Sequence, residues 1–157
     1  MDKGQSLEHA IRAESERLGF VACGFAERSP EGDFYNAMLL ANRDGDIVHI
    51  HRKNFLYKTD ETWAKEGGAF ACREIPGLAK CGFGICMDLN PRKFENPFDW
   101  FEFASHLYEP PLKPLEKPSR RRHRLAANLV ILCNSWLKTP GDELANADER
   151  CSTLLNY

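Results

Sequence analysis

The amino-acid sequence predicts an α/β protein, because short runs of alternating apolar residues, typical of strands, are interspersed with two segments of helical character. Its 157 residues, 43% of them apolar, suffice for one domain with a hydrophobic core. The formal net charge of -2 gives no general attraction to nucleic acid or to anionic membranes. No apolar run approaches the roughly 20 residues that span a bilayer, and the polar N-terminus lacks the apolar core of a secretory signal. We therefore expect a soluble intracellular protein that binds neither nucleic acid nor membrane.

The first third of the chain predicts one helix and three strands. The apolar residues of Ser6–Leu18 fall near one face of a helix, and Gly19 is suited to end it. Strands follow over 20–27 (FVACGFAE), 35–42 (YNAMLLAN) and 46–53 (DIVHIHRK). A turn over 29–33 separates the first two strands, and a hairpin turn with an Asp44-Gly45 pair joins the last two.

Two histidines lie on the third predicted strand. His49 and His51 are two residues apart, so their side chains point to the same side of the sheet. They can be read as two metal ligands or as structural histidines that need only a hydrogen-bond partner. We favour the structural interpretation, because no third ligand is suggested nearby, and we expect neither a metal nor a cofactor.

The middle of the chain predicts a long loop, a strand and a helix. Lys53–Leu78 is polar and contains several glycines, which suits a loop around the mouth of an active site. Residues 80–86 (KCGFGIC) form the next predicted strand. The aromatic segment Pro97–Tyr108 predicts a helix packed on the sheet.

The C-terminal part predicts an insertion followed by one more strand. Residues 110–124 are rich in proline and cations and indicate an exposed insertion. Within it, Arg120–Arg124 is interpreted as a solvated loop rather than a nuclear-import or polyanion patch. The last predicted strand, 126–133 (AANLVILC), ends at Asn134-Ser135-Trp136.

The cysteines fall into two groups by their surroundings. The chain has six cysteines: Cys23, Cys72, Cys81, Cys86, Cys133 and Cys151. They show no repeating spacing and no C-x-x-C pair, which favours reduced thiols over disulfides or a zinc site. Cys23 and Cys133 lie in apolar runs and are predicted to be buried structural thiols.

Cys86 stands apart, because GICMD (residues 84–88) delivers its thiol to the place where a strand turns into a helix. There the backbone N–H groups of the following turn face whatever the sulfur attacks, which is a suitable setting for a nucleophile. Lys53 at the end of an earlier strand and Glu61 shortly after it add a cation and a carboxylate.

Four segments, taken in order, resemble the nitrilase (carbon–nitrogen hydrolase) superfamily. They are YNAMLLANRDGDIVHIHRKNFL (35–56), DETWAKEG (60–67), GFGICMDLNP (82–91) and LVILCNSWL (129–137). Within the superfamily, LYKTDETWAKEG and ICMDLNPRKFENP are most similar to the eukaryotic protein N-terminal asparagine amidohydrolases. The resemblance implies an α-β-β-α sandwich.

The resemblance also implies a Glu-Lys-Cys catalytic set with a second, supporting glutamate. Cys86 matches the nucleophile, Lys53 the lysine and Glu61 the supporting glutamate. Attack of the thiolate on an amide carbon would give a thioester, and Lys53 with the N–H of Met87 would hold the developing oxyanion. A nearby cation also favours the thiolate.

The sequence departs from the family pattern at both ends. The family's general-base glutamate precedes the region that matches here, and Pro30-Glu31 lies at the wrong place in the order to replace it. The chain also stops before the later strands of the family. We therefore expect residues 1–157 to form a partial carbon–nitrogen hydrolase domain that is incomplete at both ends, with exposed sheet edges and apolar faces.

The function implied by the resemblance is deamidation of an N-terminal Asn, or also Gln, of a polypeptide, which feeds the N-degron route. Asp88 would then bind the free α-amine of the substrate. Two alternatives remain: a related hydrolase of small amides or N-carbamoyl compounds, and a non-catalytic remnant that binds a partner through a sheet edge or the basic loop. We also expect a location in the cytoplasm, with the nucleus as the alternative, and assembly as a homodimer.

Overall fold

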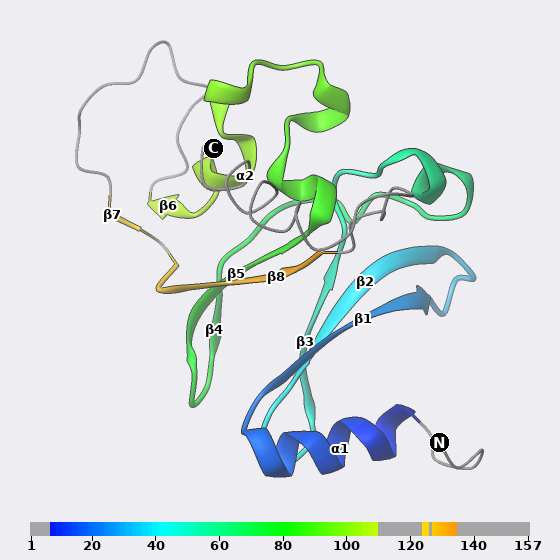
Figure 1. Cartoon of the computed structure of the whole chain (residues 1–157), viewed down its shortest axis with the longest axis vertical. Coiled ribbons are helices and arrows are strands. Elements are labelled where there is room, and N and C mark those ends of the chain that lie inside the picture. Colours follow the sequence, from blue (N-terminus) through cyan, green and yellow to red (C-terminus); the bar gives the residue numbers. More distant parts are fainter. Residues whose placement is uncertain (1–6, 110–123, 126, 135–157) are drawn as a thin grey trace, which may run out of the picture.

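Two three-stranded sheets pack face to face in the computed structural model, which describes residues 7–109, 124–125 and 127–134 (Figure 1). The first sheet has the antiparallel order β1-β2-β3, from β1 (Val21–Arg28), β2 (Phe34–Ala41) and β3 (Ile47–Arg52). The second has the order β4-β5-β8, from β4 (Arg73–Ile75), β5 (Ala79–Ile85) and β8 (Leu129–Cys133). Strand β5 runs antiparallel to β4 and parallel to β8.

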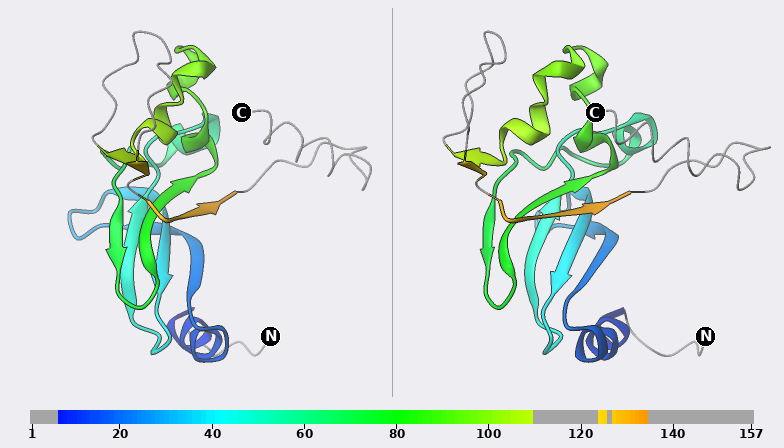
Figure 2. Two further views of the ribbon diagram at one scale, coloured as in Figure 1. Left: turned by 90° about the vertical axis from the view of Figure 1, so that its left-hand side faces the viewer. Right: turned by 60° about the vertical axis from the view of Figure 1, so that its left-hand side comes forward.

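Helical segments pack against each of the two sheets and lie at opposite ends of the molecule (Figure 2). Helix α1 (Leu7–Leu18) packs Ile11 against Leu39 and Ala41 of β2. The short helix α2 (Glu102–Ser105) lies on the second sheet, where Phe103 and Leu107 form a cluster with Ala127. A two-stranded ladder of β6 (Tyr108–Glu109) and β7 (Arg124–Leu125) follows α2. The layers therefore have the α-β-β-α order that the sequence predicts.

The main core lies between the sheets. Met38 and Leu40 of β2 face Cys81, Phe83 and Ile85 of β5, and all five side chains are buried. Alternation along β2 sends Leu39 to the α1 side, so this strand is apolar on both faces. Burial on both faces makes β2 the central support for the residues that follow β3.

Local signals in the first part of the chain are confirmed. Gly19 ends α1 with a φ of 101°, and its N–H donates to the Ser15 carbonyl at 2.8 Å. In the hairpin turn, Asn42 Oδ1 accepts from the N–H groups of Asp44 and Asp46 at 3.0 and 2.9 Å.

Two predictions for the middle of the chain are wrong. Residues 97–108 do not form one helix: a 3₁₀ turn, Phe98–Trp100, is followed by Phe101 in the left-handed region at a φ of 46°, and α2 has only four residues. The Glu102 carboxylate accepts from the Arg92 N–H and from Asn96, which holds this irregular path. The long loop also contains β4, which the Pro76-Gly77 turn folds back onto β5.

The cysteines also differ from the prediction. Cys81 is the fully buried thiol, whereas Cys23 and Cys133 are half-buried. None of the five described cysteines forms a disulfide, and Cys151 lies outside the described residues. Burial raises the pKa of Cys81, which makes this thiol unreactive.

The edge strands expose apolar side chains, as the sequence predicts. Ile47 and Ile50 on β3 and Leu132 on β8 are 52%, 41% and 41% exposed. No helix in the described part of the chain combines the length and the apolar character needed to cross a membrane. The predicted insertion at 110–124 lies almost wholly outside the described residues, as do Ser135 and Trp136.

Candidate active site

Cys86 lies at the junction of a strand and a turn, as the sequence predicts. It follows β5 directly and opens a 3₁₀ turn over Cys86–Leu89. Its φ of 45° is in the left-handed region, which is uncommon for a residue with a side chain and is typical of constrained functional positions. Its N–H donates to Oδ1 of Asn134, just after β8, at 3.1 Å. Because β5 and β8 are parallel, both residues lie at the same edge of the second sheet.

Asp88 joins this turn to the end of β3. One carboxylate oxygen accepts from the backbone N–H groups of Asn54 and Phe55 at 2.9 and 2.8 Å. The other accepts from the Ile85 N–H at 2.8 Å and lies 3.3 Å from His51 Nε2. Asn54 is next to Lys53, and Ile85 is next to Cys86. A single carboxylate therefore brings the two predicted catalytic segments together from different sheets.

The prediction that Asp88 binds a substrate amine is wrong. Its side chain has no exposed surface, and both oxygens are occupied by donors from the protein. A buried carboxylate that accepts from several donors acts as an internal crosslink. Asp88 thus shapes the site rather than contacting a substrate.

Lys53 follows β3 and is buried, with 3% of its surface exposed. Its N–H donates to the Asn36 carbonyl of β2 at 2.8 Å, which continues the ladder of the first sheet beyond β3. Its ammonium lies 2.6 Å from Oδ2 of Asp60. A buried ammonium requires such an anionic partner.

Asp60, rather than Glu61, provides that partner. Asp60 Oδ1 accepts from the side-chain amide of Asn36 at 3.0 Å, and Oδ2 also accepts from the Tyr57 N–H at 3.2 Å. Burial raises the pKa of Asp60, but the hydrogen bonds from Lys53 and Asn36 outweigh it, so the pKa lies below its ordinary value. Glu61 is exposed in the same 3₁₀ turn, Lys58–Thr62, and the structure does not bring it to Lys53.

Two further contacts hold the loop that follows Lys53. The Gly67 N–H donates to the Lys53 carbonyl at 2.8 Å, and a Cβ at Gly67 would overlap the Arg52 carbonyl, so only glycine fits there. Glu66 receives hydrogen bonds from Arg92 on both carboxylate oxygens, at 2.8 and 2.7 Å. Arg92 lies in the segment after Cys86, so this exposed ion pair is a second link between the two segments.

Met87, whose N–H is predicted to hold the oxyanion, is the second residue of the turn that Cys86 opens. The first N–H groups of such a turn have no acceptor within it, so their hydrogen-bonding capacity is directed outward. The Met87 side chain is buried and anchors the turn.

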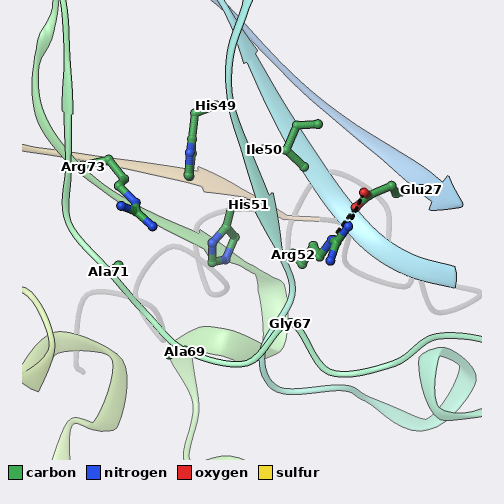
Figure 3. Close-up of a pocket in the computed structure, with 9 residues that line it drawn as sticks. All are labelled: Glu27, His49, Ile50, His51, Arg52, Gly67, Ala69, Ala71 and Arg73. Atoms are coloured by element: carbon green, nitrogen blue, oxygen red, sulfur yellow. Dashed lines mark hydrogen bonds and ion pairs between the residues drawn. The ribbon is translucent and has the colours of Figure 1, made fainter. Parts of the chain in front are cut away.

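The two histidines of β3 border a cavity of about 320 Å³, which is also lined by the segment 67–73 that leads into β4 (Figure 3). Arg73 of β4 lies across from them, and Arg52 is paired with Glu27 (Figure 3). His51 contacts Asp88, and the His49 ring lies 4.3 Å from the Phe83 ring. Burial, with the neighbouring His51 and Arg73, lowers the pKa of His49, which favours the neutral ring.

These contacts agree with the structural interpretation of the histidines. Across the described residues there is no group of three or more His, Cys, Asp or Glu side chains arranged to hold a metal.

Comparison with known proteins gives two matching relatives and a set of similar structures, whereas no family model matches the chain. The protein N-terminal amidase of Schizosaccharomyces pombe is 29% identical over 136 residues, covering 84% of this chain and 46% of that protein. The protein N-terminal amidase of Saccharomyces cerevisiae is 32% identical over 122 residues, covering 66% of this chain and 27% of that protein. The chain is homologous to the protein N-terminal amidases.

Solved structures agree with this relationship at the level of the fold. A crystal structure of N-terminal amidase with an Asn-Glu-Ala peptide superposes with a TM-score of 0.66 and 23% identity, over 99% of this chain and 38% of that one. A protein of the CN-hydrolase superfamily from Xanthomonas campestris superposes with a TM-score of 0.58 and 21% identity, over 98% of this chain and 49% of that one. The N-terminal amidase homologue therefore has the carbon–nitrogen hydrolase fold and spans less than half of the relatives it matches.

Sequence reasoning locates only part of this amidase-like site. It finds the positions of Cys86 and Lys53, but not the carboxylate that contacts the lysine. The position of Asp60 next to Glu61 could have indicated its role. In a short turn neighbouring side chains point in different directions, so either acid could face the lysine. Glu31, left unassigned at the sequence level, is exposed in the turn between β1 and β2.

Proposed function

We propose that this chain carries the nucleophile and the lysine of an N-terminal amidase, which converts an N-terminal Asn of a polypeptide to Asp and releases ammonia. The observation that carries the proposal is the Asp88 crosslink, which holds the residues next to Lys53 and Cys86 on one carboxylate. Homology to the N-terminal amidases of two yeasts supports this class of reaction. The Asn-Glu-Ala peptide in the structure of one such enzyme supports Asn at the substrate's N-terminus.

The chemistry follows from the groups at the site. The Cys86 thiolate attacks the side-chain amide carbon, and the C–N bond breaks as the nitrogen takes up the proton that the thiol gave up and leaves as ammonia. The resulting thioester is cleaved by water, which gives the carboxylic acid and restores the thiol. The Lys53 ammonium and the Met87 N–H stabilise the negative charge on the carbonyl oxygen in both steps.

The test is ammonia release from a short peptide with N-terminal Asn, with the full chain and a Cys86→Ala variant. We expect release that needs Cys86, because this cysteine follows β5 directly and opens the turn that Asp88 holds. The same peptide with an acetylated N-terminus tests recognition of the free amine, and a peptide with N-terminal Gln tests the breadth of the site.

The outcomes separate the alternatives. Equal release from the acetylated peptide, or from small amides and N-carbamoyl compounds, favours a related hydrolase of the superfamily. No release from a folded sample contradicts the proposal for this chain and favours a non-catalytic partner-binding role. Delivery of the product to the N-degron route, a cytoplasmic or nuclear location and dimerisation stay predictions.

A further inference from the structure

We propose that the cavity between β3 and the segment 67–73 is a binding site for a small oxyanion, a carboxylate or a phosphate group, which Arg73 and His49 hold. The site does not depend on the proposed function, because neither Cys86 nor Lys53 lines this cavity. Its volume of about 320 Å³ lies at the lower end of the range for small-molecule sites, which suits a small anion.

The first observation is the charge of the cavity wall. Arg73 of β4 is exposed, and its guanidinium forms no ion pair with the residues that the structure describes. Glu27, the acid of the lining, accepts from Arg52 on both carboxylate oxygens, at 2.8 and 2.6 Å. Its charge is therefore already compensated, and the wall keeps a cation that no acid of the lining neutralises.

The second observation is that the donors converge from two sheets. Figure 3 shows the Arg73 side chain pointing from β4 toward the imidazole rings of β3. The His49 ring is half-buried and packs on the Phe83 ring, with 4.3 Å between their centroids, which fixes its position. An oxyanion between these groups can accept from the ring and from the guanidinium, whose fork matches carboxylate and phosphate oxygens.

The third observation is the electrostatic environment of His49. Burial lowers its pKa, and so do His51 and Arg73, the titratable groups that face it from β3 and β4. The nearby carboxylate of Asp88 lies beyond His51, against Nε2 of that ring. A bound anion supplies the negative charge that His49 lacks and raises its pKa. Binding is therefore expected to strengthen as the pH falls through the pKa of His49.

The experiment follows the histidine ring signals of the full chain by nuclear magnetic resonance, and His49→Gln identifies the signal of His49. Sulfate is the tetrahedral probe and succinate is the carboxylate probe, each added at an ionic strength held constant with sodium chloride. We expect at least one probe to shift the His49 signal to saturation, and that probe identifies the class of anion. The pKa of His49 should then rise by about one unit, which corresponds to about tenfold tighter binding to the charged ring.

Three variants make the result specific. Arg73→Gln removes the unneutralised cation and should weaken binding about tenfold or more. Arg73→Lys keeps the charge but loses the fork, so a smaller loss is expected, and this variant carries the test if Arg73→Gln does not fold. Arg43→Gln is the matched control, because Arg43 is an exposed arginine of the hairpin turn between β2 and β3, and it should bind the probe like the unmodified chain.

The proposal is overturned by any of three results. These are a His49 signal that neither probe saturates, equal binding by Arg73→Gln and Arg43→Gln, or a pKa of His49 that falls when the probe binds. The measurement does not require amide hydrolysis. A chain that binds a probe and releases no ammonia therefore supports the anion site and contradicts only the proposed function, whereas ammonia release without probe binding does the reverse.

Discussion

Two carboxylates hold the end of β3, and they do so in different ways. Asp88 has no exposed surface and accepts from three backbone N–H groups and lies against one imidazole. Asp60 is 14% exposed and accepts from an ammonium, a side-chain amide and one backbone N–H. The first fixes the path of the chain and the second fixes the place of a charge. We therefore expect stability and reactivity at this site to depend on different acids.

The largest expected effect is that of Asp88→Asn. The amide keeps one acceptor oxygen but turns an NH₂ group toward backbone N–H donors, and these buried groups lose their partners. Each buried unsatisfied group costs about 1–3 kcal/mol, so we expect a loss of about 2–4 kcal/mol, or of the cooperative transition altogether. Urea unfolding followed by circular dichroism measures it.

Asp44→Asn is the matched control for this substitution, because Asp44 is exposed in the hairpin turn. Its unfolding midpoint should equal that of the unmodified chain. An Asp88→Asn variant as stable as this control would mean that Asp88 is not the crosslink between the two segments.

A smaller effect, with a distinct pH dependence, is expected for the stability of Asp60→Asn. The pKa of Asp60 in the folded chain lies below its ordinary value of 3.8. Its stabilising contribution is therefore complete above about pH 4 and is lost as the pH falls through the folded-state pKa. Because the substitution leaves a buried ammonium without its counter-ion, we expect a clear loss of stability at pH 7 that is smaller than the loss in Asp88→Asn.

Urea midpoints of the unmodified chain and Asp60→Asn between pH 2.5 and 7 test this sign. The two curves should lie apart at neutral pH and converge in acid. A difference that grows as the pH falls would show that the folded chain favours the protonated acid, against the contacts of Asp60 with Lys53 and Asn36.

The elements of the fold were predictable where local chemistry decides them. The hairpin at Asp44-Gly45, the helix end at Gly19 and the position of Cys86 all depend on residues close in sequence. The irregular path of residues 97–108, where the sequence predicts one helix, was not predictable in the same way. Its path depends on the Glu102 carboxylate, which accepts from residues six and ten positions earlier instead of continuing a helix.

The sequence marks the segments that hold the proposed reacting groups, but it does not mark the roles of their supports. The segments around Lys53 and Cys86 carry motifs, whereas the roles of Asp60 and Asp88 depend on which way a side chain points from a turn. Neighbouring acids such as Asp60 and Glu61 are alike in composition, and only the packing of the turn decides which one is buried. The same applies to Asp88, because its partners Asn54, Phe55 and His51 lie more than 30 residues away along the chain.

The smallest expected effect concerns Glu66, which also links the segments after Lys53 and Cys86. Its ion pair with Arg92 is bidentate, like the strongest pairs of this type, but the two side chains are 38% and 51% exposed. Water and salt screen such a pair, so its geometry gives little stability. We expect Glu66→Gln, Arg92→Gln and the double variant to unfold at nearly the same urea concentration as the unmodified chain.

A double-mutant cycle at low and high salt isolates the contribution of this pair. A coupling that approaches the loss seen in Asp88→Asn would mean that the exposed link, rather than the buried carboxylate, holds the two segments together. Glu66 and Asp88 both accept hydrogen bonds on each of their carboxylate oxygens. The expected difference in their contributions to stability therefore comes from burial and not from the number of hydrogen bonds. The site is therefore expected to tolerate changes at its surface and to fail at Asp88.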